Sequence, residues 1–204
     1  MWGRVQTLNS AINAAIAVIE VSSPALGYRA LDLVTQESGL EILEATAHGP
    51  KVFTLLVRGA KSQLETVVRK TSSSISSTGD STLRDSIIID AINPQIIETY
   101  FSLHTTEMTE ALLVVECETL SGLFQAAQNA VTHHKLTAIE LRNLRGDNPV
   151  ALGLFTGTYK DCVDASEGIK QMLSNQARSG VVEAINNPTK SFRHFFNLVP
   201  GTRT

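Results

Sequence analysis

The sequence is poor in the residues around which small catalytic and metal-binding domains are built. Its 204 residues include two cysteines, Cys117 and Cys162, and neither belongs to a CxxC or a mixed Cys/His pattern. It also has no glycine-rich phosphate loop, no Walker pattern and no Ser/His/Asp arrangement with supporting spacing. These absences argue against a disulfide framework, favour the reducing cytoplasm, and lead us to expect a protein that is not an enzyme.

Charged and aromatic residues are scarce as well. Charged residues make up 18% of the chain, aromatic residues 5%, and the net charge is -3. Nucleic-acid binding requires a Lys/Arg footprint, and no basic cluster occurs, so we expect no nucleic-acid partner. No apolar run reaches the ~18 residues that span a bilayer, so we expect no membrane segment. The composition is that of ordinary globular domains.

What is present is an internal repeat. Residues 14–103 and 110–198 are two copies of a unit about 90 residues long. Matching segments follow the same order in both copies: 17–20 with 113–116, Ala30 with Ala126, Leu40 with Leu136, 57–59 with 155–157, 91–94 with 184–188, and 100–103 with 195–198. We therefore expect an arm over residues 1–13 and two domains, 14–106 and 107–204, each large enough to bury a core.

Each copy shows the same succession of elements. Apolar runs predict strands at 16–21 and 111–117, and the helices that follow, 25–37 and 120–133, are expected to be capped by Ser23 and Thr119. The other expected strands are 40–47, 52–57, 87–91, 136–144, 150–155 and 181–185, and the second helices lie near 61–71 and 158–173. The Ser/Thr-rich run 71–81 predicts a flexible loop, and Asn-Pro opens a short terminal helix in each copy. This β-α-β-β-α-β order predicts an α+β fold of two tandem, non-permuted ferredoxin-like domains.

The ordered motifs resemble a known family. Each copy opens with an apolar strand ending in Glu, Val18-Ile19-Glu20 or Val114-Val115-Glu116, and continues into a helix, with Gln125-Ala126-Ala127 in the second copy. A strand ending in Arg58-Gly59 and an Ile92-Asn93-Pro94 element then follow in the first copy. This set resembles the bacterial microcompartment shell domain, and the fused pair resembles the tandem-domain, trimer-forming shell proteins. The resemblance implies a homotrimer with pseudohexameric shape, other shell proteins as partners, and a central pore for small polar metabolites.

The resemblance also implies site residues. The family's pore turn maps onto His48, Gly49, Pro50 and Lys51 in the first copy and onto Arg145, Gly146, Asp147 and Asn148 in the second. Neither turn holds the cysteine through which some tandem members bind an iron–sulfur cluster, so we expect no cofactor and no metal. The family's edge lysine, which helps neighbouring discs tile, is replaced by Gln36 and Thr132, with His133 and Lys135 just beyond the latter. Tiling by this chain alone is therefore expected to be poor.

Several side chains invite a catalytic or metal-binding interpretation. His133 and His134 are adjacent, so on a helix they point in different directions, and no third ligand lies nearby in the sequence. Glu20 and Glu116 could form a catalytic pair, but each ends a strand where a carboxylate can accept from helix N–H groups, and this structural role is favoured. His48, beside Gly49, is interpreted as a solvent-facing turn residue or a pore residue rather than a general base.

Two classes of function remain open. The first is a structural shell protein in a bacterial microcompartment in the cytoplasm. The alternative is a trimeric ferredoxin-like regulator that senses a small molecule, for which segment 71–81 is the candidate ligand-closing loop although it lacks a Lys/Arg cluster for phosphates. Because fold analogy does not by itself decide function, the ordered motifs favour the shell protein.

Overall fold

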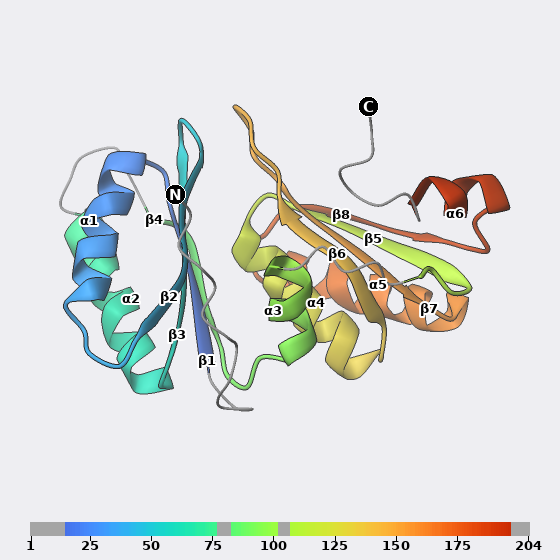
Figure 1. The fold of residues 1–204 in the computed structure, drawn as a ribbon, viewed down its shortest axis with the longest axis horizontal. Helices are drawn as coiled ribbons and strands as arrows, with labels where there is room; N and C mark the ends of the chain where they lie inside the picture. The colour runs from blue at the N-terminus through green and yellow to red at the C-terminus, as the bar shows by residue number, and fades with distance from the viewer. Residues whose placement is uncertain (1–14, 77–82, 102–106, 197–204) are drawn as a thin grey trace. The chain divides into compact units, whose positions relative to one another are not determined.

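The computed structural model describes residues 15–76, 83–101 and 107–196 (Figure 1). The chain divides into two compact units, Met1–Ile92 and Asn93–Thr204. The expected arm 1–13 lies outside the described residues. The repeat boundary expected at residue 106 stays a prediction, because the division at Ile92 follows the packing of the chain and not the matching of its sequence.

The first unit is a four-stranded sheet with two helices. Its elements are β1 (Ala15–Val21), α1 (Pro24–Thr35), β2 (Glu41–Gly49), β3 (Val52–Gly59), α2 (Lys61–Ser76) and β4 (Leu83–Ile89). The strands are ordered β2-β3-β1-β4, and all of the pairings are antiparallel. The apolar run of β1 thus lies at the centre of the sheet, where all seven of its residues are buried.

The second unit repeats this arrangement and carries an additional helix at each end. After α3 (Pro94–Phe101) come β5 (Ala111–Cys117), α4 (Leu120–His133), β6 (Thr137–Asn143), β7 (Ala151–Gly157), α5 (Tyr159–Asn175), β8 (Gly180–Ile185) and α6 (Lys190–Phe196). The sheet order β6-β7-β5-β8 matches that of the first unit. The prediction of an α+β fold with two tandem, non-permuted β-α-β-β-α-β domains is confirmed.

The repeat extends to fine detail. In β2 the register shifts between Ile42 and Glu44, and in β6 it shifts between Ala138 and Glu140. These are equivalent positions, because each shift begins two residues after the matched pair Leu40 and Leu136. Such bulges re-aim the edge strand, and both copies keep the same one.

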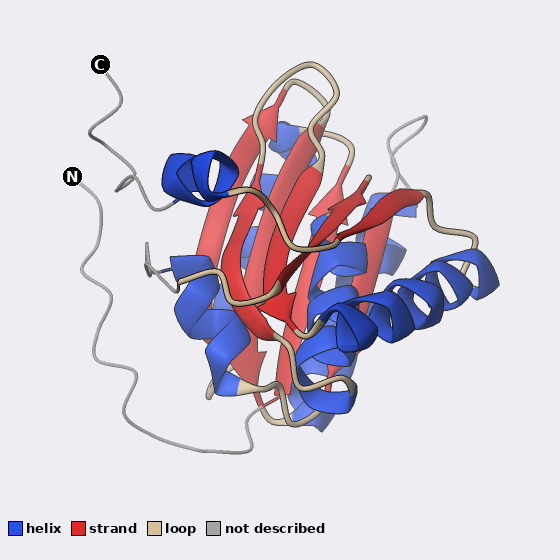
Figure 2. Ribbon diagram, turned by 90° about the vertical axis from the view of Figure 1, so that its right-hand side faces the viewer, coloured by secondary structure: helices blue, strands red, loops and turns tan. Residues whose placement is uncertain are grey.

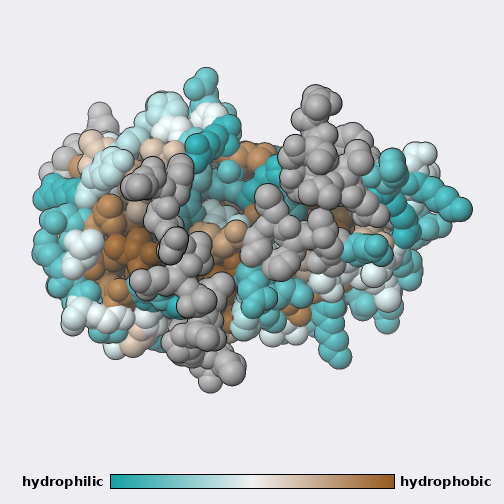
Figure 3. Space-filling view, viewed as in Figure 1, coloured by the Kyte–Doolittle hydropathy of each residue, from teal (hydrophilic) through white to brown (hydrophobic). Residues whose placement is uncertain are grey.

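In the first unit α1 and α2 cover one face of the sheet, and in the second unit α4 and α5 cover one face of theirs (Figure 1). In the first unit the core lies between this face and α1 and α2, and it contains Ala17, Ile19, Phe53, Leu55 and Leu64. Apolar residues also reach the visible surface of this unit where α1 and α2 lie (Figure 3).

The two cores are filled in opposite ways. In the first unit the helix supplies Gly27 and the strand supplies Phe53 and Leu55, all of them buried. In the second unit Leu123 occupies the helix position, and the strand has Ala151 and Gly153. A Cβ atom on Gly27 would lie 2.1 Å from Phe53 Cγ, and one on Gly153 would lie 2.7 Å from Leu123 Cδ1. The large and small residues have exchanged layers, so both cores stay close-packed.

Some local predictions are wrong. The described part of the predicted loop 71–81 continues α2 to Ser76, because Thr71 and Ile75 are buried and extend the stripe of Leu64 and Val67. The strand predicted at 87–91 is β4, which ends at Ile89. Pro188 does not open α6: Thr189 Oγ1 accepts from Phe192 N at 3.2 Å and caps a helix that begins at Lys190.

The predicted caps of the first helix in each copy differ in outcome. Thr119 Oγ1 accepts from Gly122 N at 3.1 Å, so the predicted cap of α4 is confirmed. Ser23 stands at the equivalent position of α1 but makes no side-chain cap hydrogen bond. The proline that follows, Pro24, has no N–H to present, and its fixed φ suits a first helical position.

Helix α6 lies on the face of its sheet opposite α4 and α5 (Figures 1 and 2). Phe192 packs there against a cluster that includes Leu112 and Leu154. Arg193 holds the helix by donating to the carbonyl oxygens of Thr109, Glu110 (3.1 Å) and Pro188 (2.9 Å). The orientation of α6 on its own unit is therefore fixed by one apolar and one cationic side chain.

Candidate functional site

The first predicted pore segment lies at the β2–β3 turn. His48 and Gly49 are the last residues of β2, and Pro50 and Lys51 form the turn itself. His48 is 6% exposed, and its Nε2 lies 2.9 Å from Glu44 Oε1. Its Nδ1 has no hydrogen-bond partner among the described residues. The interpretation of His48 as solvent-facing is therefore wrong for its side chain, whereas Pro50 and Lys51 are exposed.

The second predicted pore segment is the loop between β6 and β7. Arg145, Gly146, Asp147 and Asn148 are all exposed there. An added Cβ at Gly146 would meet no atom within 4 Å, so the turn stands clear of the rest of its unit. Each pore segment thus occupies the equivalent hairpin of its own unit, and the pore assignment itself stays a prediction.

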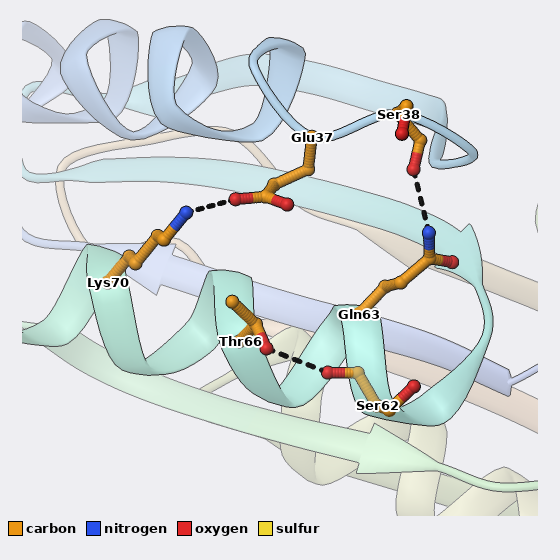
Figure 4. A network of polar contacts seen from close by, with 6 residues as sticks. All are labelled: Glu37, Ser38, Ser62, Gln63, Thr66 and Lys70. Carbon is orange, nitrogen blue, oxygen red and sulfur yellow. Dashed lines mark hydrogen bonds and ion pairs between the residues drawn. The ribbon is translucent and has the colours of Figure 1, made fainter.

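The first predicted edge residue, Gln36, caps the C-terminal end of α1. Its Nε2 donates to Asp32 Oδ2 at 2.9 Å. The next residues are tied to α2: Lys70 pairs with Glu37, and Gln63 Nε2 donates to Ser38 O at 2.7 Å (Figure 4). The segment that carries Gln36 is therefore held on both sides by polar contacts.

The edge residues of the second unit lie where α4 ends. Thr132 and His133 are exposed in its last turn, and Lys135 follows in the connection to β6. Lys135 has a φ of 56°, and the equivalent first-unit residue, Gly39, has a φ of 79°. A lysine in the left-handed region costs about 1 kcal/mol that a glycine does not. The second copy therefore carries a long cation where the backbone favours glycine.

The structure shows the environments of the residues that invited a catalytic or metal-binding interpretation. Glu20 is 1% exposed and Glu116 is exposed, so the two carboxylates lie in different environments. Within the described ranges no three His, Cys, Asp or Glu side chains gather in a way that could hold a metal ion. Cys117 and Cys162 are free and buried.

A contact surface that the sequence did not predict is formed by α3. Although α3 ends the first repeat in sequence, it packs on β6 and α4. Asn93 N donates to Gln128 Oε1 at 3.0 Å, and Ala138 N donates to Gln95 Oε1 at 3.1 Å. The rings of Tyr100 and Phe124 meet edge to face with centroids 5.2 Å apart. The apolar and aromatic residues of 93–100 indicate that this helix packs against a partner surface, but they do not indicate which repeat it contacts.

The equivalent surface of the first unit is open. Counting from the matched pairs Ala30/Ala126 and Leu40/Leu136, Tyr28 corresponds to Phe124 and Ile42 to Ala138. Phe124 is 0% exposed and Tyr28 is 63% exposed. Ala138 is buried, whereas Ile42 is half-buried. Asp32, which corresponds to Gln128, is exposed as well. We call Tyr28, Asp32 and Ile42 the α1–β2 face.

Comparisons with known proteins agree with the topology. No protein-family model matches the chain, and no curated protein sequence matches it. Among solved structures, a microcompartments protein from Desulfitobacterium hafniense DCB superposes with a TM-score of 0.72 at 20% sequence identity, covering 89% of this chain and 98% of that one.

Two further structures match far less well. A putative glycine cleavage system transcriptional repressor has a TM-score of 0.32 at 16% identity, covering 87% of this chain and 100% of that one. A chlorite dismutase from Candidatus Nitrospira defluvii has a TM-score of 0.30 at 9% identity, covering 93% and 97%. Neither bears on function.

None of the described helices is long and apolar enough to cross a membrane.

The two equivalent sheets, their shared bulge and the superposition over both repeats lead to one conclusion. The chain has the fold of a microcompartment protein built from two tandem, non-permuted domains.

Proposed function

We propose that the protein is a structural, non-enzymatic component of a bacterial microcompartment shell in the cytoplasm. It assembles as a homotrimer whose six domains form a pseudohexameric ring. The superposition on a microcompartments protein, which extends over both repeats, carries this proposal. Three chains of two equivalent domains each allow cyclic closure, the usual symmetry of homo-oligomers.

The ring has a central pore for small polar metabolites. The two hairpin segments, 48–51 and 145–148, occupy equivalent places in the two units and would alternate around the axis. Lys51 and Asp147 carry opposite charges, and both are exposed. Their fields offset each other, so the pore selects weakly between ions.

The rim of the ring bears Gln36, Thr132, His133 and Lys135. Gln36 and Thr132 are neutral, and Gln36 is already engaged with Asp32. Tiling into a shell therefore depends on other shell proteins as partners.

The alternative, a ligand-sensing trimeric regulator, loses its main support. Its candidate ligand-closing loop was segment 71–81, and residues 71–76 of this segment are helical. No described feature favours this alternative over the shell protein.

Solution mass tests the proposal most directly. Sedimentation of the purified full chain should give a species of three chain masses at micromolar concentration, and electron microscopy should show ring-shaped particles. A stable single chain at that concentration would contradict the proposed function.

A further inference from the structure

Helix α3 shows how the end of one repeat is received by the next. It covers Phe124 with Tyr100 and places Gln95 against the backbone of Ala138. The second unit is thereby closed by a helix from within the same chain. The α1–β2 face of the first unit is built from the equivalent positions, but among the described residues no equivalent helix lies on it.

The chain contains one more helix of the same kind. α6 follows β8 as α3 follows β4, and the caps Asn93 and Thr189 are equivalent, since Asn93 Oδ1 accepts from Gln95 N and Thr189 Oγ1 from Phe192 N. Counted from these caps, which shift the register by one residue from the sequence match of 100–103 with 195–198, Gln95 corresponds to Ser191, and Glu98 corresponds to His194. Ser191, like Tyr28, is exposed.

The last strand of each unit differs in burial between the two units. β4 ends at Ile89 and β8 ends at Ile185, and the two residues pair with Ile16 and Leu112, which are themselves equivalent. Ile89 is 8% exposed and Ile185 is 36% exposed. Among the described residues, Ile185 on the β8–α6 side of the second unit and Tyr28 on the α1–β2 face of the first unit are therefore left exposed.

We propose that α6 of one copy docks on the α1–β2 face of the next copy, the place equivalent to the one that α3 occupies on β6 and α4, through side chains other than Phe192 and Arg193, which hold α6 on its own unit. The occupant is a second copy of this chain, and the docking names the contact by which the proposed ring closes, so it rests on the proposed function. Two different surfaces meet, so the interface is heterologous. Repetition of a heterologous interface closes a ring when the rotation between copies divides a full turn, and the proposed trimer requires a threefold rotation.

Charge agrees with this pairing. α6 carries Lys190, Arg193 and His194, and the receiving face carries Asp32. Arg193 is already used to hold α6 on its own unit, which presents the helix in a fixed orientation. Docking a pre-oriented helix costs less ordering entropy than docking a free one.

Two substitutions to glutamate disrupt the two sides separately. Tyr28→Glu places a charge on the receiving face, and Ser191→Glu places one on the docking face of α6. Ser191 is exposed, and Tyr28 is 63% exposed although its ring centroid lies 5.0 Å from that of the buried Phe53. Circular dichroism therefore checks that each unit keeps its fold. A buried interface tyrosine is commonly a hot spot, so each variant should weaken assembly roughly 30-fold or more, leaving single chains at micromolar concentration.

A matched control comes from the same comparison of the two repeats. Tyr159→Glu changes another exposed tyrosine, at 37% exposure, whose counterpart Lys61 is exposed in the first unit. This control should keep the wild-type mass. If Tyr28→Glu lowers the stability of its unit, Asp32→Lys tests the same face.

Mixing the two disrupted variants gives the sharpest result. The Tyr28→Glu chain retains an intact α6, and the Ser191→Glu chain retains an intact face, so one good interface forms and then stops. The mixture should contain a species of two chain masses that neither variant forms alone. Absence of this species, or a three-chain mass for Tyr28→Glu by itself, overturns the docking while leaving the ring proposal standing. A single-chain wild type overturns the ring proposal itself.

Discussion

Cys162 is a buried thiol that the fold keeps protonated. It lies on α5 with no exposed surface. Burial, helped by the charges of Asp161 and Glu110, raises the pKa of this thiol from 9.0 to about 11. Because the thiolate is the reactive form, Cys162 should resist thiol reagents at pH 8 in the folded chain and react once the chain is unfolded in urea. A Cys117→Ala background isolates its signal.

The same shift makes stability depend on pH. Below pH 9 the thiol is protonated in both states, so its contribution to folding is fully present. As the pH rises towards about 11, the unfolded chain loses this proton first, and the contribution, roughly 2–3 kcal/mol, is lost. Urea unfolding at pH 8 and at pH 10.5 measures this change. Between these two pH values the free energy of unfolding should fall more for the parent chain than for Cys162→Ala. Equal falls would show that the thiol does not drive the change.

Two single residues, Thr119 and His48, show which local features could be predicted from the sequence and which could not. Thr119 was predicted as a cap because its hydroxyl precedes an apolar helical stripe, and it is one. His48 was expected to face solvent, or to line the pore, because it lies at a predicted turn, yet its side chain is buried beside Glu44. A cap depends on local chain geometry, whereas burial depends on distant neighbours that the sequence does not reveal.

At the scale of elements, the packing of α1 on β3 depends on Gly27. A methyl group there would lie 2.1 Å from Phe53 Cγ in a buried layer. Gly27→Ala should lower the free energy of unfolding by about 1–3 kcal/mol, because overpacking outweighs the ~1 kcal/mol gained in helix propensity. Urea denaturation measures the change.

Gly168 on α5 provides the matched control. A Cβ there would meet His134 Nε2 at 3.5 Å, an ordinary contact distance. Gly168→Ala should therefore raise stability by about 0.5–1 kcal/mol, since alanine loses less conformational entropy on folding. If both variants moved stability in the same direction, the close approach of α1 to Phe53 would not be the cause.

The order of helices and strands was predictable because the same sequence pattern occurs at matching positions of both copies. The apolar runs of β1 and β5, at matching places in two copies, fixed both strands. The end of α2 was missed because its Ser/Thr-rich run has loop-like composition. Thr71 and Ile75 are nevertheless buried in the core, and this tertiary packing overrides local propensity.

For the whole molecule, the rim residues predict poor self-tiling. In the proposed ring, Gln36 and Thr132 lie on the rim, at the positions that the resemblance assigns to the edge lysine of the shell-protein family. Gln36→Lys combined with Thr132→Lys should increase the number of sheets or tubes seen by electron microscopy of the purified protein. Ser62→Lys combined with Ser174→Lys adds the same charge at exposed positions of α2 and α5 and should not. Ready tiling by the parent chain would contradict this role of the rim.

The candidate site was only partly predictable at this scale. The resemblance assigned a pore role to two hairpins and a rim role to the ends of α1 and α4. These segments occupy equivalent positions of the two units, and their roles stay predictions. The packing of α3 on β6 and α4 was not predicted, because nothing in Asn93, Gln95 or Tyr100 states which repeat they will contact. Only the differing burial of equivalent positions reveals it.

The packing of α3 also has a consequence for synthesis on the ribosome. α3 is translated before β5, β6 and α4, yet Ile96 and Ile97, at 0% and 5% exposure, are buried in the unit that those elements build. These side chains must wait in water until roughly forty more residues have emerged, which takes a few seconds at ordinary elongation rates. During this period the apolar side chains of α3 are exposed and prone to associate with other chains. Polysomes bring nascent copies close together, which favours such association. Fusing the two repeats shortens this exposure, because the surface that receives α3 is always the next segment to be made.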